Sequence, residues 1–136
     1  VLSMKINRVD HIGIAVPNLQ EAKKFYEEVL GIKITKEDEV IEDQKVKVSF
    51  VPCGEVELEL LESTTEDGPI AKYSGIQHVA LNVDNIEEAI AEMKEKGVRM
   101  IDEQPRYGAG NSSIAFVHPK ASGILVELAQ RLDETK

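Results

Sequence analysis

The order of apolar and polar positions predicts a strand followed by a helix at the start of the chain. Residues 9–16 alternate as a half-buried strand does, and His11 shares its face with small side chains. Asn18 then predicts a helix cap, because its side chain can accept from the backbone three residues on. An apolar stripe at helical spacing follows over residues 19–30 and ends at Gly31, a residue type typical of helix C-termini.

Three further strands complete this half of the sequence. The alternation predicts them at residues 32–40, 45–51 and 55–61, with a hairpin turn at Cys53-Gly54 between the last two. Residues 63–74 are polar and contain Gly and Pro, which indicates a linker.

The pattern then restarts. His78 lies third in a predicted strand at residues 76–83, Asn85 is a second cap, and the helix that follows ends at Gly97. Strands are predicted at residues 98–101, 113–117 and 124–129.

The repeat holds at individual positions. His11 and His78 lie 67 residues apart (78 − 11), and Glu59 and Glu127 lie 68 apart (127 − 59). The sequence therefore predicts an α+β fold of two βαβββ modules, at about 5–62 and 75–130, within a single domain. Because one such module is too small to bury its own core, we expect the modules to pair into one cupped, mixed sheet.

The four repeated residues predict a metal site. A single histidine or glutamate in a strand is more often a packed or solvent-facing residue than a ligand. Here, however, Gly13, Ala15 and Ala80 leave space beside the histidines, as a cleft requires. Two imidazoles and two carboxylates, His11, Glu59, His78 and Glu127, form a nitrogen and oxygen set suited to a divalent transition metal. Cobalt, manganese, nickel and zinc all accept such a set.

Composition excludes several classes of protein. A formal net charge of −9 argues against nucleic acid as a partner, because phosphate binding requires a basic face. No apolar run approaches the roughly 20 residues of a membrane span. The single cysteine, Cys53, excludes an intrachain disulfide and a CxxC motif. No signal-peptide pattern opens the chain, so we expect a cytoplasmic protein with a small-molecule partner.

Three stretches resemble the vicinal oxygen chelate superfamily, whose members pair βαβββ modules around one metal. They read DHIGIAVPNLQEAKKFYEEVLG, GPIAKYSGIQHVALNVDNI and PRYGAGNSSIAFVHPKASGILVELAQ, and the resemblance extends over about residues 5–130. Within the superfamily, the PIAKY linker, the GAG turn and the HPK ending are most similar to the methylmalonyl-CoA epimerase family.

The resemblance implies an isomerase of propionate metabolism that uses one divalent metal per chain. Its metal ligands fall on His11, Glu59, His78 and Glu127. The implied reaction interconverts (2R)- and (2S)-methylmalonyl-CoA by removal of the C2 proton, with the enolate chelated by the metal. Some relatives carry a glutamate base on the third strand, where this chain has Val48. Glu127 and Glu59 are therefore the expected catalytic bases.

The resemblance also implies contacts to the acyl-CoA and a homodimer. The candidate substrate-binding residues are His118, Lys120, Arg106, Gly108 and Gly110, of which the two glycines also permit a tight turn. A loop that Pro119 orders is an equally good explanation of His118 and Lys120.

Three other functions stay open. A glyoxalase I (lactoylglutathione lyase) would use the same ligands to isomerise a hemithioacetal. An extradiol dioxygenase would need two histidines and one carboxylate around iron. A metal-free small-molecule-binding protein of the bleomycin-resistance type would lack the ligand set.

Overall fold

The computed structural model describes residues 4–134, and these form two compact units. We call them the His11 unit, which is His11–Gln77, and the His78 unit, which comprises the residues up to Asp10 and those from His78 onward. Strand β1 (Ile6–Ala15) and strand β5 (Gly75–Val83) each contribute residues to both units. No helix among residues 4–134 is long and apolar enough to cross a membrane.

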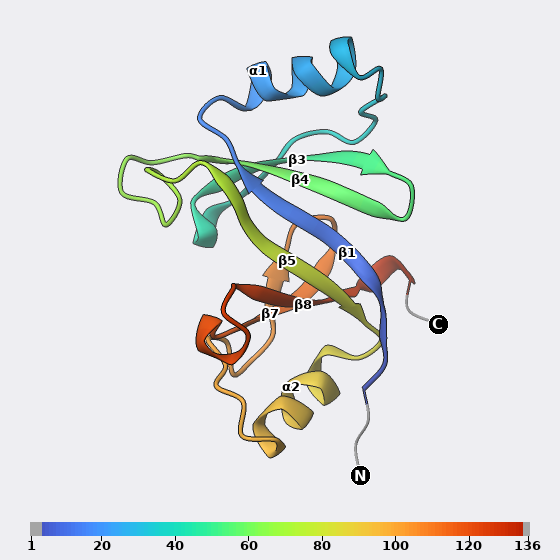
Figure 1. Cartoon of the computed structure of the whole chain (residues 1–136), viewed down its shortest axis with the longest axis vertical. Coiled ribbons are helices and arrows are strands. Elements are labelled where there is room, and N and C mark those ends of the chain that lie inside the picture. The colour runs from blue at the N-terminus through green and yellow to red at the C-terminus, as the bar shows by residue number, and fades with distance from the viewer. Residues whose placement is uncertain (1–3, 135–136) are drawn as a thin grey trace. The chain divides into compact units, whose positions relative to one another are not determined.

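The His11 unit follows the order strand, helix, three strands. Its further elements are α1 (Leu19–Lys24), one π-helical turn (Phe25–Val29), β2 (Glu39–Ile41), a 3₁₀ turn (Glu42–Gln44), β3 (Val46–Cys53) and β4 (Val56–Ser63). The strands are arranged in the order β2-β3-β4-β1 (Figure 1). The β1 and β4 strands are parallel, and the other neighbours are antiparallel.

The His78 unit repeats this order. After β5 it contains α2 (Ile86–Glu95), β6 (Arg106–Gly108), β7 (Ser112–Val117), a 3₁₀ turn (Pro119–Ala121), β8 (Val126–Arg131) and a last turn (Leu132–Glu134). The strand order is β1-β5-β8-β7-β6, with β5 and β8 parallel and β7 antiparallel to β6 and β8. The predicted α+β fold with two βαβββ modules is confirmed.

The two helix starts are identical in their capping. The side chain of Asn18 accepts from the backbone N–H of Glu21, and that of Asn85 accepts from Glu88, both at 3.0 Å. Each bond satisfies one of the donors that a helix start leaves unpaired. Gly31 and Gly97, at φ of 73° and 78°, follow the helix ends in the left-handed conformation that glycine adopts without strain.

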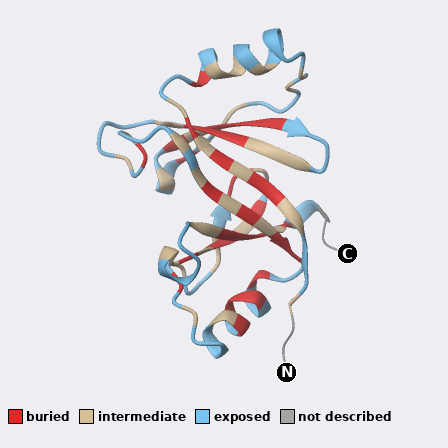
Figure 2. Cartoon of the chain, viewed as in Figure 1, coloured by how far each residue is buried: buried red, intermediate tan, exposed pale blue. Residues whose placement is uncertain are grey.

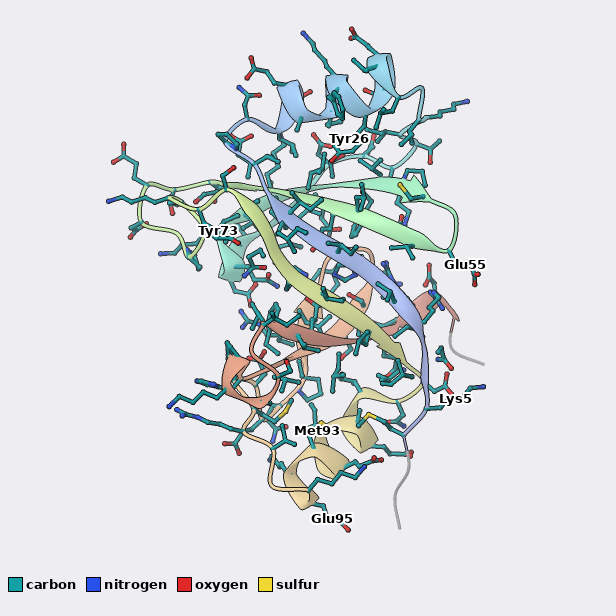
Figure 3. All side chains as sticks on the ribbon, in the orientation of Figure 1. Lys5, Tyr26, Glu55, Tyr73, Met93 and Glu95 are labelled. Carbon is teal, nitrogen blue, oxygen red and sulfur yellow. The ribbon has the colours of Figure 1, made fainter. Side chains whose placement is uncertain are left out.

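Each helix covers one face of its own sheet. In the His11 unit, Leu19, Val51 and Leu60 form the buried cluster beneath α1, and Tyr26 packs against it (Figure 3). In the His78 unit, α2 contributes Ile86, Ala89 and Ile90 to the buried cluster, so its inner face is buried in Figure 2. The opposite face of each sheet is the one on which the histidines lie.

The predicted strand at 32–40 is wrong for most of its length. Regular pairing begins at Glu39, and the residues before it form a loop whose Ile32 and Ile34 pack against the α1 cluster. The alternating apolar residues correctly indicated that Ile32 and Ile34 are partly buried. They pack against the cluster from a loop, however, and not from a strand. The hairpin turn also lies one residue later than predicted, at Gly54-Glu55.

The predicted strand at 98–101 is also wrong. Met100 makes an isolated bridge to Val117. Two residues later, the carboxylate of Asp102, in place of a backbone carbonyl, accepts from the backbone N–H of Phe116 at 2.8 Å. The strand that pairs with this edge of β7 comes later, at Arg106–Gly108. The alternation of apolar residues does not show where a side chain replaces a backbone carbonyl as the acceptor, so it could not predict this end of the pairing.

Candidate functional site

The His11 unit holds one imidazole and one carboxylate in contact. Nε2 of His11 lies 3.4 Å from Oε1 of Glu59, and the two residues are 3% and 6% exposed. Glu59 is the register partner of Gly13, two residues along β1 from His11 and on the same face. Because Gly13 has no side chain, the carboxylate can extend back along the strand to the imidazole.

The His78 unit repeats this arrangement. Nε2 of His78 lies 3.3 Å from Oε1 of Glu127, and the exposed fractions are 4% and 3%. Here the register partner of the glutamate is Ala80, again two residues beyond the histidine. An imidazole–carboxylate pair is therefore present in each unit, with a small residue at the same register position.

A phenylalanine completes each pair. The ring of Phe50 meets His11 edge-on, with centroids 6.2 Å apart and planes at 81°, and Phe116 meets His78 at 5.5 Å and 90°. Each phenylalanine is also the antiparallel register partner of the glutamate in its pair. Sequence reasoning missed both residues, although Phe-Val occurs at 50–51 and 116–117, at nearly the offset of the histidines.

The spacing within each pair fits two ligands of one metal ion. Nitrogen and oxygen ligands bonded at about 2.0–2.2 Å to one ion lie roughly 2.8–3.1 Å apart at octahedral angles and roughly 3.3–3.6 Å apart at tetrahedral angles. The distances of 3.4 and 3.3 Å fall in the tetrahedral range and lie beyond the usual N–H···O distance. Burial of a carboxylate also costs free energy unless a partner compensates its charge, and a divalent ion does so.

His118 and Lys120, the predicted substrate contacts in the HPK segment, lie near Arg99. Nδ1 of His118 accepts from the backbone N–H of Lys120 at 3.1 Å, and the backbone N–H of His118 bonds to the carbonyl of Arg99. Desolvation first, and then the charges of Arg99 and Lys120, lower the pKa of His118 below its ordinary value. The imidazole is therefore held neutral beside two cations.

Arg106 lies on β6 and is already paired. Its Nη1 is 3.3 Å from Oδ1 of Asp102, and the other oxygen of that carboxyl group accepts from the backbone N–H of Phe116 on β7. The guanidinium is partly exposed, so an anion would share it with Asp102.

The two predicted turn glycines have different structural roles. Gly110, at φ of 74°, lies with Asn111, at 55°, in the turn between β6 and β7. Gly108 is required by packing instead, because a Cβ there would lie 2.6 Å from Cγ2 of Ile114 and 2.7 Å from Oγ of Ser112.

Comparison with known proteins identifies the family. A sequence profile of the Glyoxalase/Bleomycin resistance protein/Dioxygenase superfamily matches residues 10–116. The chain belongs to this superfamily.

Several proteins similar to this chain are named as epimerases. The mitochondrial methylmalonyl-CoA epimerase of Bos taurus is 38% identical, over 92% of this chain and 75% of its own length. The ethylmalonyl-CoA/methylmalonyl-CoA epimerase of Cereibacter sphaeroides is 36% identical, over 92% of this chain and 98% of its own. A solved methylmalonyl-CoA epimerase in complex with methylmalonyl-CoA and NH4+ aligns with a TM-score of 0.88 and 33% identity, over 94% of this chain and 96% of that one. The resemblance that the sequence suggested is confirmed.

Proposed function

We propose that one divalent metal ion takes both histidine–glutamate pairs as ligands. Each pair alone offers two protein ligands, which is fewer than the three or four of typical protein sites. The duplication supplies the rest, since His11 and Glu59 have His78 and Glu127 as counterparts with matching burial and spacing. Cobalt, manganese, nickel and zinc all suit this mixed set.

The proposed reaction is the interconversion of (2R)- and (2S)-methylmalonyl-CoA. The observation that carries this proposal is the presence of a buried, histidine-paired glutamate in each half of a chain similar to named epimerases. Epimerisation at C2 needs one base on each face of the substrate. The two glutamates provide a candidate for each base.

The proton transfers are assigned to Glu59 and Glu127. One carboxylate accepts the C2 proton and becomes a carboxylic acid, while the other, protonated, donates a proton to the opposite face. A bound divalent ion would supply Lewis-acid stabilisation of the negative charge that develops on the substrate oxygens. Strand β3 itself reads VKVSFVPC and contains no carboxylate, and Val48 on it is fully buried.

The acyl-CoA contacts belong to the same proposal. Lys120 and Arg106 offer positive charge to a substrate that carries a carboxylate and phosphates, and His118 offers a neutral ring nitrogen. The backbone groups of the turn that contains Gly108 and Gly110 are further candidate hydrogen-bonding partners of the acyl-CoA. A homodimer and a cytoplasmic location remain predictions from the sequence.

Exchange of the C2 proton tests the proposal directly. Methylmalonyl-CoA in deuterated water is incubated with metal-loaded protein and followed by NMR, with and without chelator. We expect deuterium at C2 and equilibration of the two epimers, both abolished by chelator and restored by added metal. Turnover of the methylglyoxal–glutathione hemithioacetal without C2 exchange would instead favour a lactoylglutathione lyase. Failure to bind any metal, with tight binding of an apolar cation, would favour a metal-free binding protein.

A further inference from the structure

A buried ion pair joins the middle of β1 to the end of β8 within the His78 unit. Nε of Arg131 lies 3.1 Å from both carboxylate oxygens of Asp10, and Nη2 lies 2.6 Å from Oδ1. Asn82 adds a third donor, with Nδ2 at 2.9 Å from Oδ2 of Asp10. Asp10 and Arg131 are only 2% and 7% exposed, so water does not solvate these charges.

Such a pair is poorly explained by stability alone. Removal of two charges from water costs about as much as their attraction returns, and apolar pairs of similar volume often stabilise as well or better. The role of the pair therefore lies in the segments that it holds in place. Asp10 directly precedes His11, and Asn82 lies on β5, four residues beyond His78 on the same face.

Arg131 also holds the turn between β6 and β7. Its remaining nitrogen, Nη1, donates to the carbonyl of Gly110 at 3.1 Å. The carbonyls on either side are held as well: Oγ of Ser112 donates to Ala109 at 2.9 Å, and the N–H of Leu132 donates to Asn111 at 3.0 Å. Three successive carbonyls of this turn thus accept hydrogen bonds, and the central one accepts from the guanidinium that pairs with Asp10.

We propose that the Asp10–Arg131 pair is a positioning element for the substrate site, which holds the turn at residues 108–112 in the conformation that binds an anionic acyl thioester. Without Asp10, Arg131 would be a buried cation lacking its carboxylate and would turn toward water. The carbonyl of Gly110 would then lose the hydrogen bond from Nη1 of Arg131, at the first of two successive residues of left-handed backbone. This inference rests on the proposed function, because that function is what makes the turn a substrate contact.

The test compares three variants with the wild type in their metal-loaded forms. Arg131→Met removes the Nη1 donor to Gly110 and the two guanidinium nitrogens nearest Asp10, which keeps Asn82 at 2.9 Å and Arg8 at 3.7 Å. Asp10→Leu combined with Arg131→Met replaces the pair by an apolar one and so relieves the buried charge. Lys23→Met, which breaks the Lys23–Asp38 pair of 2.9 Å in the His11 unit, is the matched control. The measurements are amide hydrogen exchange at Asn111 and Ser112, KM and kcat with methylmalonyl-CoA, and metal content.

We expect the apolar double variant to be stable, to bind one metal, and yet to exchange the turn amides faster. Its KM should rise about tenfold or more while kcat changes less, because a charge-assisted hydrogen bond that orders a binding segment has been lost. Lys23→Met should leave all three measurements unchanged. If the double variant keeps wild-type exchange at the turn, or wild-type KM, the pair is a packing feature and the proposal is wrong. If wild-type protein shows no epimerase activity while the turn still loosens in the variants, the anchoring stands and the proposed function fails.

Discussion

Oε1 of Glu127 lies 3.3 Å from Nε2 of His78, across the parallel strands β5 and β8. Glu59 has the same relation to His11 at 3.4 Å. A glutamate at this position is close enough to share a metal with its histidine, and it is also a candidate base. The two roles can be separated by experiment, because a glutamine keeps an oxygen ligand but cannot accept a proton at neutral pH.

Glu127→Gln and Glu59→Gln should each retain metal and lose epimerisation by roughly 10²- to 10⁴-fold, the usual contribution of a general base. If the two carboxylates serve opposite faces, each variant should still exchange the C2 proton of one epimer, and the epimer should differ between the variants. Deuterium incorporation into each resolved epimer, followed by NMR, measures this.

Glu57→Gln is the control for that pair of variants. Glu57 lies on β4 two residues before Glu59, and its carboxylate pairs with Lys36 at 3.1 Å. Wild-type exchange is expected. The assignment of bases would be wrong if Glu127→Gln bound metal normally and exchanged the proton at the wild-type rate.

Phe50→Leu and Phe116→Leu should weaken metal binding by about two- to tenfold, since an edge-on aromatic contact contributes about 0.5–1.5 kcal/mol. Each ring meets its imidazole edge-on and so restricts the orientation of the nitrogen that would bind the ion. Competition with a chromophoric chelator measures the affinity. Phe25→Leu, in the exposed turn after α1, should leave it unchanged. Equal metal affinity in all three variants would show that the rings serve packing alone.

The sequence singled out the repeated histidines and glutamates better than it predicted the elements around them. Histidine and glutamate carry chemistry, so a repeat of each at nearly the same offset was informative, and each structural pair joins the residues of one half. Phe50 and Phe116 lie at a similar offset but are read as ordinary core residues, because nothing in a phenylalanine indicates that its edge contacts an imidazole. The ion pair between Asp10 and Arg131 depends on strand order, which local patterns do not contain.

Gly108→Ala should destabilise the protein by about 1–3 kcal/mol, as overpacking of a core typically does. The added Cβ would lie 2.6 Å from Cγ2 of Ile114 and 2.7 Å from Oγ of Ser112, and both neighbours are 2% exposed and cannot easily move. Chemical denaturation gives the free energy of unfolding.

Gly54→Ala provides the comparison, because a Cβ at Gly54 has no atom within 4 Å. The substitution there costs only the backbone strain of an alanine at a φ of 69°. That cost is about 1–2 kcal/mol. A smaller loss at Gly108 than at Gly54 would mean that the β6–β7 turn yields to the added methyl group.

The pKa of His118 lies below its ordinary value, and Lys120→Met should raise it. Partial desolvation is the largest cause, followed by the charges of Arg99 and Lys120, so removal of one charge should restore part of the shift. The bond from the N–H of Lys120 to Nδ1 gives an independent reason, because Nδ1 can accept only while it is unprotonated. A depressed folded-state pKa means that the native state binds fewer protons than the unfolded state between that pKa and about 6.5. The free energy of unfolding should therefore decrease as the pH falls through this interval, and less so in Lys120→Met.

Histidine ring signals in NMR spectra report this titration directly, since the chain contains three histidines. Lys45→Met is the matched control, because Lys45 pairs with Asp67 in the His11 unit and should leave the His118 pKa unchanged. An equal shift in both variants would indicate a general effect of net charge. No shift in Lys120→Met would mean that desolvation and Arg99 alone keep the ring neutral, and a neutral His118 would then be a property of the fold and not of the HPK sequence.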